Sequence, residues 1–156
     1  MTNHQSNSFL SNFVSVAGYA LGISYPVLAL STGVRALYQM FFRADIVNRL
    51  GPTLTAVAAA LYLVAAVGFL LRKKWAWRMS VGVLVIETLG AIVVGTLSFI
   101  QPQMFEHTVW RHFGQDYGFF PFFQPLLGLL WLFWPETLKA YGLSSLATSS
   151  WPKESQ

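Results

Sequence analysis

The sequence predicts an all-α protein, an integral membrane four-helix bundle whose N- and C-termini both lie in the cytoplasm (N-in/C-in). Three observations lead to this fold class. Of the 156 residues, 54% are hydrophobic and only 10% are charged, whereas a typical soluble domain carries about 25% charged residues. Four apolar runs contain almost no charge, and a basic cluster joins the second run to the third. Because so short a chain buries only a limited fraction of its surface in water, a lipid environment is expected.

The apolar runs are expected to be the spans, since about 20 helical residues cross a bilayer core about 30 Å thick. The expected spans are residues 9–33, 53–71, 76–100 and 119–135. The first contains Pro26, a residue that can kink a helix, and the fourth is short and interrupted by Pro121 and Pro125. Residues 1–142 are therefore predicted to form a single transmembrane domain, followed by a loosely ordered cytoplasmic tail over residues 143–156.

The segment after the first span is also expected to contain helix. Residues 35–49 (RALYQMFFRADIVNR) have helical charge spacing, because Asp45 precedes Arg49 by four positions. This helix either lies on the outer membrane surface or continues the first span. The first helix therefore ends near Gly33 or continues to Phe42.

A short helix is expected between the third and fourth spans as well. Pro102 is typical of a helix start and Gly114 of a helix end. Phe105, Val109 and Phe113 would form one apolar stripe on this helix, which suits a segment lying at the membrane interface.

The orientation follows from the positive charges, because short cytoplasmic loops carry an excess of Lys and Arg. With the basic cluster in the cytoplasm, six such residues lie inside: Arg72, Lys73, Lys74, Arg78, Lys139 and Lys153. Four lie toward the outer side: Arg35, Arg43, Arg49 and Arg111. Tryptophan prefers the interface. This frame puts three tryptophans at the inner boundary and two aromatic residues at the outer one: Trp75, Trp77 and Trp134 inside, Trp110 and Tyr117 outside.

The composition also argues against several function classes. The net charge of +4 does not indicate a nucleic-acid partner, because the basic cluster lies between two apolar runs and not on a soluble face. There is no cysteine, which excludes disulfides, thiolate nucleophiles and cysteine-bound metal centres. The sequence has no recognisable Gly-rich phosphate loop, Ser-His-Asp signature or glycosidase-like carboxylate pair. We therefore expect no cofactor, and the lipid bilayer is the first expected partner.

Two stretches resemble a known group of proteins: YPVLALSTGVRALYQ (Tyr25–Gln39) and TVWRHFGQDYGFFPFFQPLLGLLWL (Thr108–Leu132). They are similar to stretches of short, uncharacterised four-span membrane proteins of high-GC Gram-positive bacteria, and the resemblance covers most of the chain. It implies a multi-pass helical bundle in a bacterial plasma membrane. It implies no activity and no site residues.

Glu87 is the first candidate for an intramembrane site, because a carboxylate within a span costs about 2.5–3.5 kcal/mol on insertion scales. If the third span begins near Ala76, Glu87 lies about 16 Å deep, close to the midplane. The same count places Tyr62 at the midplane of the second span and Tyr19 near that of the first, where a hydroxyl could donate to the carboxylate. Arg35 is the competing partner, and it reaches Glu87 only if the first helix is the longer one. Glu87 is either a polar tie within the bundle or to a neighbouring subunit, or a proton, cation, substrate or headgroup site.

A second group of polar residues lies in the predicted outer segment: His107, Arg111, His112 and Asp116. Two histidines near a carboxylate suggest a metal, but histidines five positions apart do not stack on one helix face. Arg111 between them would also repel a cation. The group is therefore interpreted as a solvated interfacial face or as an outer-loop binding or gating site, and a metal is not predicted.

The functional prediction is a non-enzymatic membrane component of unknown role that packs with itself, as a homo-oligomer, or with a larger membrane complex. Small residues such as Gly18 and Gly22 allow helices to approach closely in lipid. The alternative is a small-molecule, lipid or ion transporter that uses Glu87. Pro121 and Pro125, with Gln124 beside them, suit either a kink at a helix start or a broken helix lining a transport site.

Overall fold

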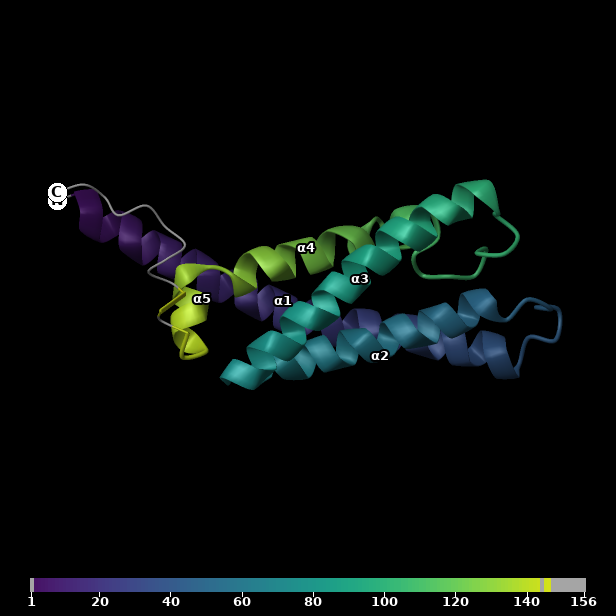
Figure 1. Ribbon diagram of the computed structural model, residues 1–156, viewed down its shortest axis with the longest axis horizontal. Coiled ribbons are helices and arrows are strands. Elements are labelled where there is room, and N and C mark those ends of the chain that lie inside the picture. Colours follow the sequence, from purple (N-terminus) through teal and green to yellow (C-terminus); the bar gives the residue numbers. More distant parts are fainter. Residues whose placement is uncertain (1, 144, 147–156) are drawn as a thin grey trace.

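The computed structural model describes residues 2–143 and 145–146, with side chains described at position 12 and from 14 onward. All secondary-structure elements in this part of the chain are helices, joined by connecting segments, and there is no strand (Figure 1). The all-α prediction is therefore confirmed. Its elements are α1 (Thr2–Phe41), α2 (Leu50–Leu70), α3 (Lys74–Ile100), the 3₁₀ segment η1 (Arg111–Tyr117), α4 (Phe120–Leu132) and α5 (Pro135–Ala140). Three described helices are long and apolar enough to cross a membrane, namely α1 over Val14–Phe41, α2 and α3, and α4 is a shorter apolar helix. The predicted tail beyond residue 146 lies outside the described residues.

Helix α1 continues to Phe41, so the longer of its two expected extents is the observed one. Gly33 does not end the helix, because it is a packing position. A methyl group at Gly33 would lie 3.3 Å from the Cβ of Ala59 in α2. Buried positions also continue beyond it at helical spacing, at Ala36 and Gln39.

The expected helix over residues 35–49 therefore ends inside its own sequence, and residues 42–49 form a connecting segment. Arg43 donates to Asp45 through Nε at 2.7 Å and through a second guanidinium nitrogen. These hydrogen bonds lower the pKa of the Asp45 carboxyl to about 2. The helical pairing of Asp45 with Arg49 that the spacing suggested is replaced by this local pair.

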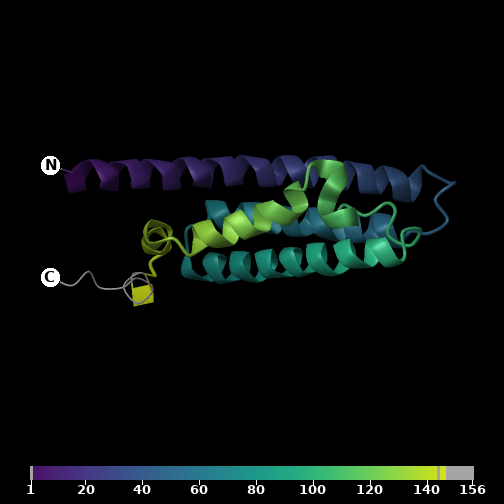
Figure 2. The ribbon, with the colours of Figure 1, turned by 90° about the horizontal axis from the view of Figure 1, so that it is seen from above.

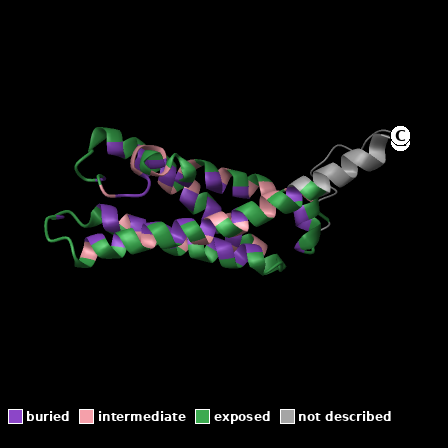
Figure 3. Cartoon of the chain, turned by 180° about the vertical axis from the view of Figure 1, so that it is seen from behind, coloured by how far each residue is buried: buried purple, intermediate pink, exposed green. Residues whose placement is uncertain are grey.

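Helices α1 and α2 lie side by side along much of their length (Figures 1 and 2). The alanines of α2 account for this close approach, since Ala58, Ala59, Ala65 and Ala66 are all buried. Small side chains let helix backbones approach in lipid, where packing and not hydrophobicity drives association. Figure 3 shows that buried residues alternate with exposed ones along the helices, so each helix keeps an exposed outer face.

The segment between α3 and α4 does not form the helix expected from Pro102 to Gly114. It makes turns as far as residue 110 and then the 3₁₀ segment η1, in which His112, Phe113 and Gly114 have left-handed φ angles of 47°, 62° and 82°. Two apolar residues of the expected stripe, Phe105 and Val109, are buried. The apolar pattern therefore reflects packing against the bundle and not one face of an interfacial helix.

Two side-chain hydroxyls hold this segment in place. Ser98 of α3 accepts a hydrogen bond from the backbone N–H of His112 at 2.8 Å. Thr55 of α2 accepts from the N–H of Val109 at 2.9 Å and donates to the carbonyl of His107 at 3.1 Å. The backbone groups of this segment have no helical hydrogen bonds, and these hydroxyls bond to them instead. Buried backbone outside regular secondary structure requires such partners.

Two aromatic rings of the segment between α3 and α4 pack against glycines of α3. A methyl group at Gly90 would lie 2.8 Å from the indole of Trp110, and one at Gly95 would lie 2.6 Å from the ring of Phe113. Trp110 is only 4% exposed. It therefore lies inside the bundle and not at the outer interface, where its sequence position had placed it.

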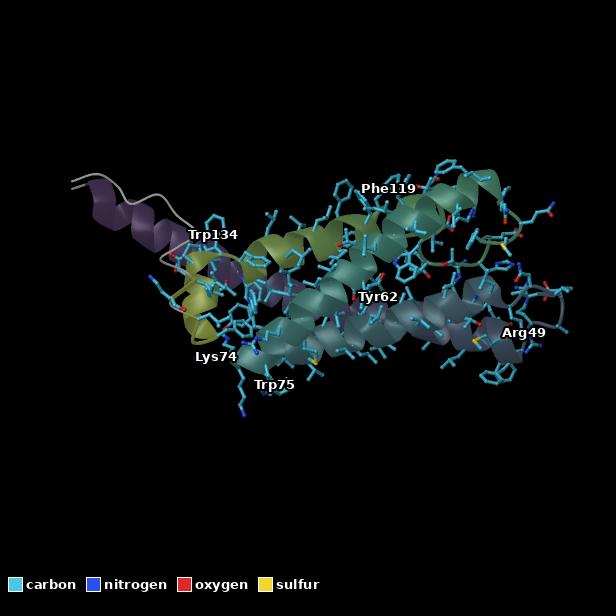
Figure 4. The ribbon with its side chains drawn as sticks, in the orientation of Figure 1. Arg49, Tyr62, Lys74, Trp75, Phe119 and Trp134 are labelled. Atoms are coloured by element: carbon cyan, nitrogen blue, oxygen red, sulfur yellow. The ribbon has the colours of Figure 1, made fainter. Side chains whose placement is uncertain are left out.

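At the opposite end, tryptophan and tyrosine side chains tie the helices together. Trp77 donates its indole N–H to the carbonyl of Leu132 at 2.9 Å, and Tyr141 donates to the carbonyl of Gly68 at 3.0 Å. Burial raises the pKa of the Tyr141 hydroxyl to about 12, so it remains a donor at neutral pH. Helix α5 turns across this end of the bundle, beside Lys74 and Trp134 (Figures 1 and 4).

Candidate functional site

The candidate site is centred on Glu87, whose side chain is fully buried in the middle of α3. It lies on the inner face of this helix, because residues at helical spacing on both sides, such as Val83 and Ala91, are buried too. Tyr25 of α1 donates its hydroxyl to Glu87 Oε2 at 3.4 Å. This distance is long for an O–H···O bond, for which about 2.7 Å is typical. Among the described residues, the carboxyl group is therefore held by one weak hydrogen bond.

Aromatic rings of α1 and α2 surround this contact. Tyr25 is fully buried and meets Tyr62 of α2 edge to face at a centroid distance of 5.9 Å, and Phe69 of α2 at 5.1 Å. Helix α4 lies close as well, since a methyl group at Gly128 would lie 3.4 Å from the Tyr25 hydroxyl. The site is thus formed where α1, α2, α3 and α4 meet, with Tyr62 at the middle of the bundle (Figure 4).

Three buried polar atoms at this site have no hydrogen-bond partner among the described residues: Glu87 Oε1, the Tyr62 hydroxyl and Trp110 Nε1. Tyr62 lies within interaction range of both the carboxyl and the indole. Its approach to Trp110 nevertheless lacks the geometry of a hydrogen bond. We call Tyr25, Tyr62, Glu87 and Trp110 the polar cluster. Since buried polar groups are normally hydrogen-bonded, two free donors beside one free acceptor leave this cluster with unused binding capacity.

Of the predicted partners of Glu87, Tyr62 lies near it and Arg35 does not. Tyr62 belongs to the polar cluster without bonding to the carboxyl. Arg35 is exposed and instead donates to the hydroxyl of Tyr117 at 3.1 Å, with its guanidinium 5.7 Å from the centre of that ring. The alternative Glu87–Arg35 contact is therefore absent from the described part of the chain, although α1 is the longer helix, because Arg35 is bonded to the segment that precedes α4.

Tyr25, the residue that does bond to Glu87, was not identified from the sequence. Tyr19 was placed near the midplane on the assumption of a helix ending at Gly33, and it is 71% exposed. With the helix extended to Phe41, the midpoint of its apolar part moves along the chain toward residue 27. The same depth count would then have selected Tyr25.

The outer-segment residues do not converge on one site. Arg111 pairs with Asp116 at 3.4 Å. The ring of His112 stacks on Phe99 at a centroid distance of 4.3 Å, and His107 contributes its backbone carbonyl to Thr55. The described residues include no group of three or more metal-ligating side chains.

An apolar groove with a volume of about 630 Å³ lies between α1 and α4. Its lining includes one polar pair, in which Gln124 Nε2 donates to the Ser24 hydroxyl at 2.9 Å. The Oε1 atom of Gln124 is buried and has no partner in the described structure. The prolines of α4 do not break this helix: Pro121 lies in its first turn, and Pro125 lies inside it.

Comparison of the chain with protein-family models, with curated proteins and with solved structures returned no match. The resemblance to four-span proteins of Gram-positive bacteria therefore stays a prediction.

Proposed function

We propose that the protein is a four-span integral membrane protein of a bacterial plasma membrane. The three long apolar helices supply three crossings. Helix α4 has 13 residues and is about 20 Å long. The preceding segment η1 packs along the outer part of α3 through Ser98 and Gly95. Non-helical backbone at membrane depth is tolerated where protein buries it, so η1 and α4 together can accompany α3 through the bilayer.

We further propose that both termini face the cytoplasm. The basic residues Arg72, Lys73, Lys74 and Arg78 cluster at the connection between α2 and α3. The start of α1 lies at this same end of the molecule (Figures 1 and 2), and Arg49 lies at the other end (Figure 4). The natural sequence has no cysteine, so Lys74→Cys and Arg49→Cys can each be labelled separately. A membrane-impermeant maleimide should reach only Arg49→Cys in intact cells, and labelling of Lys74→Cys alone would overturn the orientation.

Within this membrane, the proposed role is that of a non-enzymatic structural or accessory component that packs with itself or with a larger membrane complex. The supporting observation is that buried and partly buried polar side chains bond to the backbone of distant segments. Five of them do so: Trp77, Trp131, Thr55, Ser98 and Tyr141. The polar chemistry of the described interior therefore mainly holds the bundle together, while its outer faces carry large exposed apolar side chains.

Crosslinking tests this role. A single cysteine at Ile23 of α1, which is 66% exposed, is compared with one at Ile86 of α3, which is 54% exposed. A partner or a second copy should crosslink at one of these faces in native membranes, and mild purification should recover the same assembly. Recovery of a lone monomer from lipid particles, without a crosslink from either face, would refute the role.

A second candidate function, transport of a proton, a cation or a small molecule, is favoured by the unpartnered atoms of the polar cluster. A carboxyl group with one weak bond, beside two free donors, can bind a proton or a small polar ligand. Proteoliposomes with an internal pH dye test proton flux directly. Glu87→Gln should abolish the flux, and Glu106→Gln, at an exposed carboxyl of the segment before η1, is the matched control. Equal flux in the two variants would dismiss this role for Glu87.

A further inference from the structure

A second groove, with a volume of about 440 Å³, lies where α5 crosses the end of the bundle. Its walls come from the part of α1 between Val14 and Ile23, the end of α2, Trp131 of α4, and α5. Arg72 follows the last turn of α2 and lines this groove, as does Thr137 of α5. Figure 4 shows Lys74 and Trp134 at the same end of the molecule. The groove thus lies at the level where basic and tryptophan side chains gather.

One wall of this groove is apolar and open. Gly18 and Gly22 follow each other by one turn on α1, and the structure uses them differently. A methyl group at Gly18 would lie 2.6 Å from the indole of Trp131, which reaches past this glycine to donate to the carbonyl of Val14 at 2.9 Å. A methyl group at Gly22 would have nothing within 4 Å. The groove therefore has free space beside Gly22, with Ile23 and Phe69 among its apolar walls.

The other wall carries Arg72 and the carboxylate of Glu136, and it lies in a positively charged region of the molecule. Five described basic residues belong to this end of the bundle, against Glu136 as its one described carboxylate: Arg72, Lys73, Lys74, Arg78 and Lys139. The hydroxyl of Thr137 is buried and has no hydrogen-bond partner in the described part of the chain. A guanidinium group and an unpartnered hydroxyl that belong to residues lining the same groove suit a phosphate group, which accepts several hydrogen bonds.

We propose that this groove binds one anionic phospholipid, whose phosphate contacts Arg72 and Thr137 and whose acyl chain lies over Gly22. We choose an anionic phospholipid as the occupant because its charge complements that of this end of the bundle. Basic pockets between membrane helices on the cytoplasmic side suit anionic headgroups. The apolar wall continues from the charged one, which matches the chemistry of a lipid better than that of a free phosphate ion. The inference rests on the membrane location and orientation proposed above, and it does not depend on which partner protein the bundle packs against.

Binding is measured on the full chain in a mild detergent, by native mass spectrometry and by thermal unfolding followed by circular dichroism. Phosphatidylglycerol and phosphatidylcholine with identical chains are added in turn. Phosphatidylglycerol should bind at one site and raise the unfolding temperature more than phosphatidylcholine does. One basic residue near a headgroup changes affinity by about fivefold. Arg72→Gln should therefore weaken phosphatidylglycerol binding by about that factor, and Glu136→Gln should strengthen it.

Two controls separate this site from general charge and from a loss of folding. Arg78→Gln removes the same charge from an exposed position outside the groove lining, and it should change binding less than twofold. Gly22→Leu fills the groove and should weaken binding. Gly82→Leu adds the same side chain at another open position, where a methyl group also has nothing within 4 Å, and it should leave binding unchanged.

Several outcomes would overturn the proposal. Equal effects of the two lipids, or equal effects of Arg72→Gln and Arg78→Gln, would show that the lipid is attracted only by the net charge of the bundle end. Competition by inorganic phosphate at similar concentration would show an ion site without a lipid chain. If Gly22→Leu abolished dimerisation while lipid binding stayed the same, the groove would belong to a second copy of the chain.

Discussion

The contact between Gly90 and Trp110 gives the sharpest test of the fold, because it exists only if the segment before α4 folds into the bundle. Alanine is favoured over glycine in a helix interior by about 0.5–1 kcal/mol. Gly82→Ala, in open space on the same helix, should therefore stabilise the protein by about that amount. At Gly90 the added methyl group would lie 2.8 Å from the indole of Trp110, which is too close for the ring to stay in place.

Overpacking of this kind costs about 1–3 kcal/mol. When the helix preference is subtracted, Gly90→Ala should range from neutral to a destabilisation of about 2.5 kcal/mol. It should therefore be about 1–3 kcal/mol less stable than Gly82→Ala. Both measurements use the free energy of unfolding, obtained by titrating SDS into bicelles and following circular dichroism.

A double-mutant cycle identifies the cause of the difference. Trp110→Leu shortens the ring that meets Gly90, so Gly90→Ala should cost nothing in that background and should behave like Gly82→Ala. Coupling energies of about 1–3 kcal/mol are expected for residues in such direct contact. If Gly90→Ala is as stabilising as Gly82→Ala in the natural sequence, the ring does not pack on α3. The account of the segment before α4 is then wrong.

Three further predictions concern hydroxyl and carboxyl groups. Tyr25→Phe removes the hydrogen bond that Tyr25 donates to the buried carboxyl of α3, and it should reduce the free energy of unfolding by about 0.5–1.5 kcal/mol. Tyr62→Phe removes a hydroxyl that has no partner among the described residues, and it should be nearly neutral. The Asp45 carboxyl, whose pKa the Arg43 hydrogen bonds lower to about 2, should titrate near that value by NMR, and Arg43→Gln should return it toward about 3.9. Its ion pair is complete above about pH 4 and is lost as the pH falls through about 2. Tyr141→Phe should lower the free energy of unfolding by about 1 kcal/mol at neutral pH. Because burial raises the pKa of Tyr141 to about 12, this difference should be constant below pH 10 and should disappear as the pH rises through 12.

Each of these predictions has an outcome that contradicts it. If Tyr25→Phe were as neutral as Tyr62→Phe, the Tyr25 hydroxyl would not bond to Glu87. An Asp45 titration near 4 that Arg43→Gln leaves unchanged would show that the pair does not form in solution. A Tyr141→Phe difference that persists above pH 12 would assign its effect to packing and not to the hydroxyl.

The sequence predicted helix and membrane character because these depend on local composition. An uncharged run such as residues 53–71 has few alternatives to a helix in lipid, since its backbone must satisfy its own hydrogen bonds. The same run appears as α2 (Leu50–Leu70), displaced by no more than three residues at either end. Glu87 could likewise be identified from the sequence alone, because a single carboxylate within an apolar run is conspicuous.

The partner of Glu87 could not be predicted in the same way, because it depended on where α1 ends. The shorter of the two expected extents ended near Gly33, but Gly33 packs closely against Ala59 of α2, and only the packed pair of helices shows that close approach is its role. The depth count based on the shorter extent selected Tyr19 in place of Tyr25. Tertiary contact, and not a local pattern, decided between the two extents.

The sequence alone therefore determined that the chain is helical, that its long apolar runs can cross a membrane, and that a carboxyl lies within one of them. Each of these properties is set by residues close together along the chain. Only the tertiary structure decided that Tyr25 meets Glu87, that Trp110 enters the bundle beside Gly90, and that Arg35 bonds to Tyr117. These contacts join residues from 20 to 82 positions apart, and side-chain shape in the packed interior selects them, which no local pattern encodes.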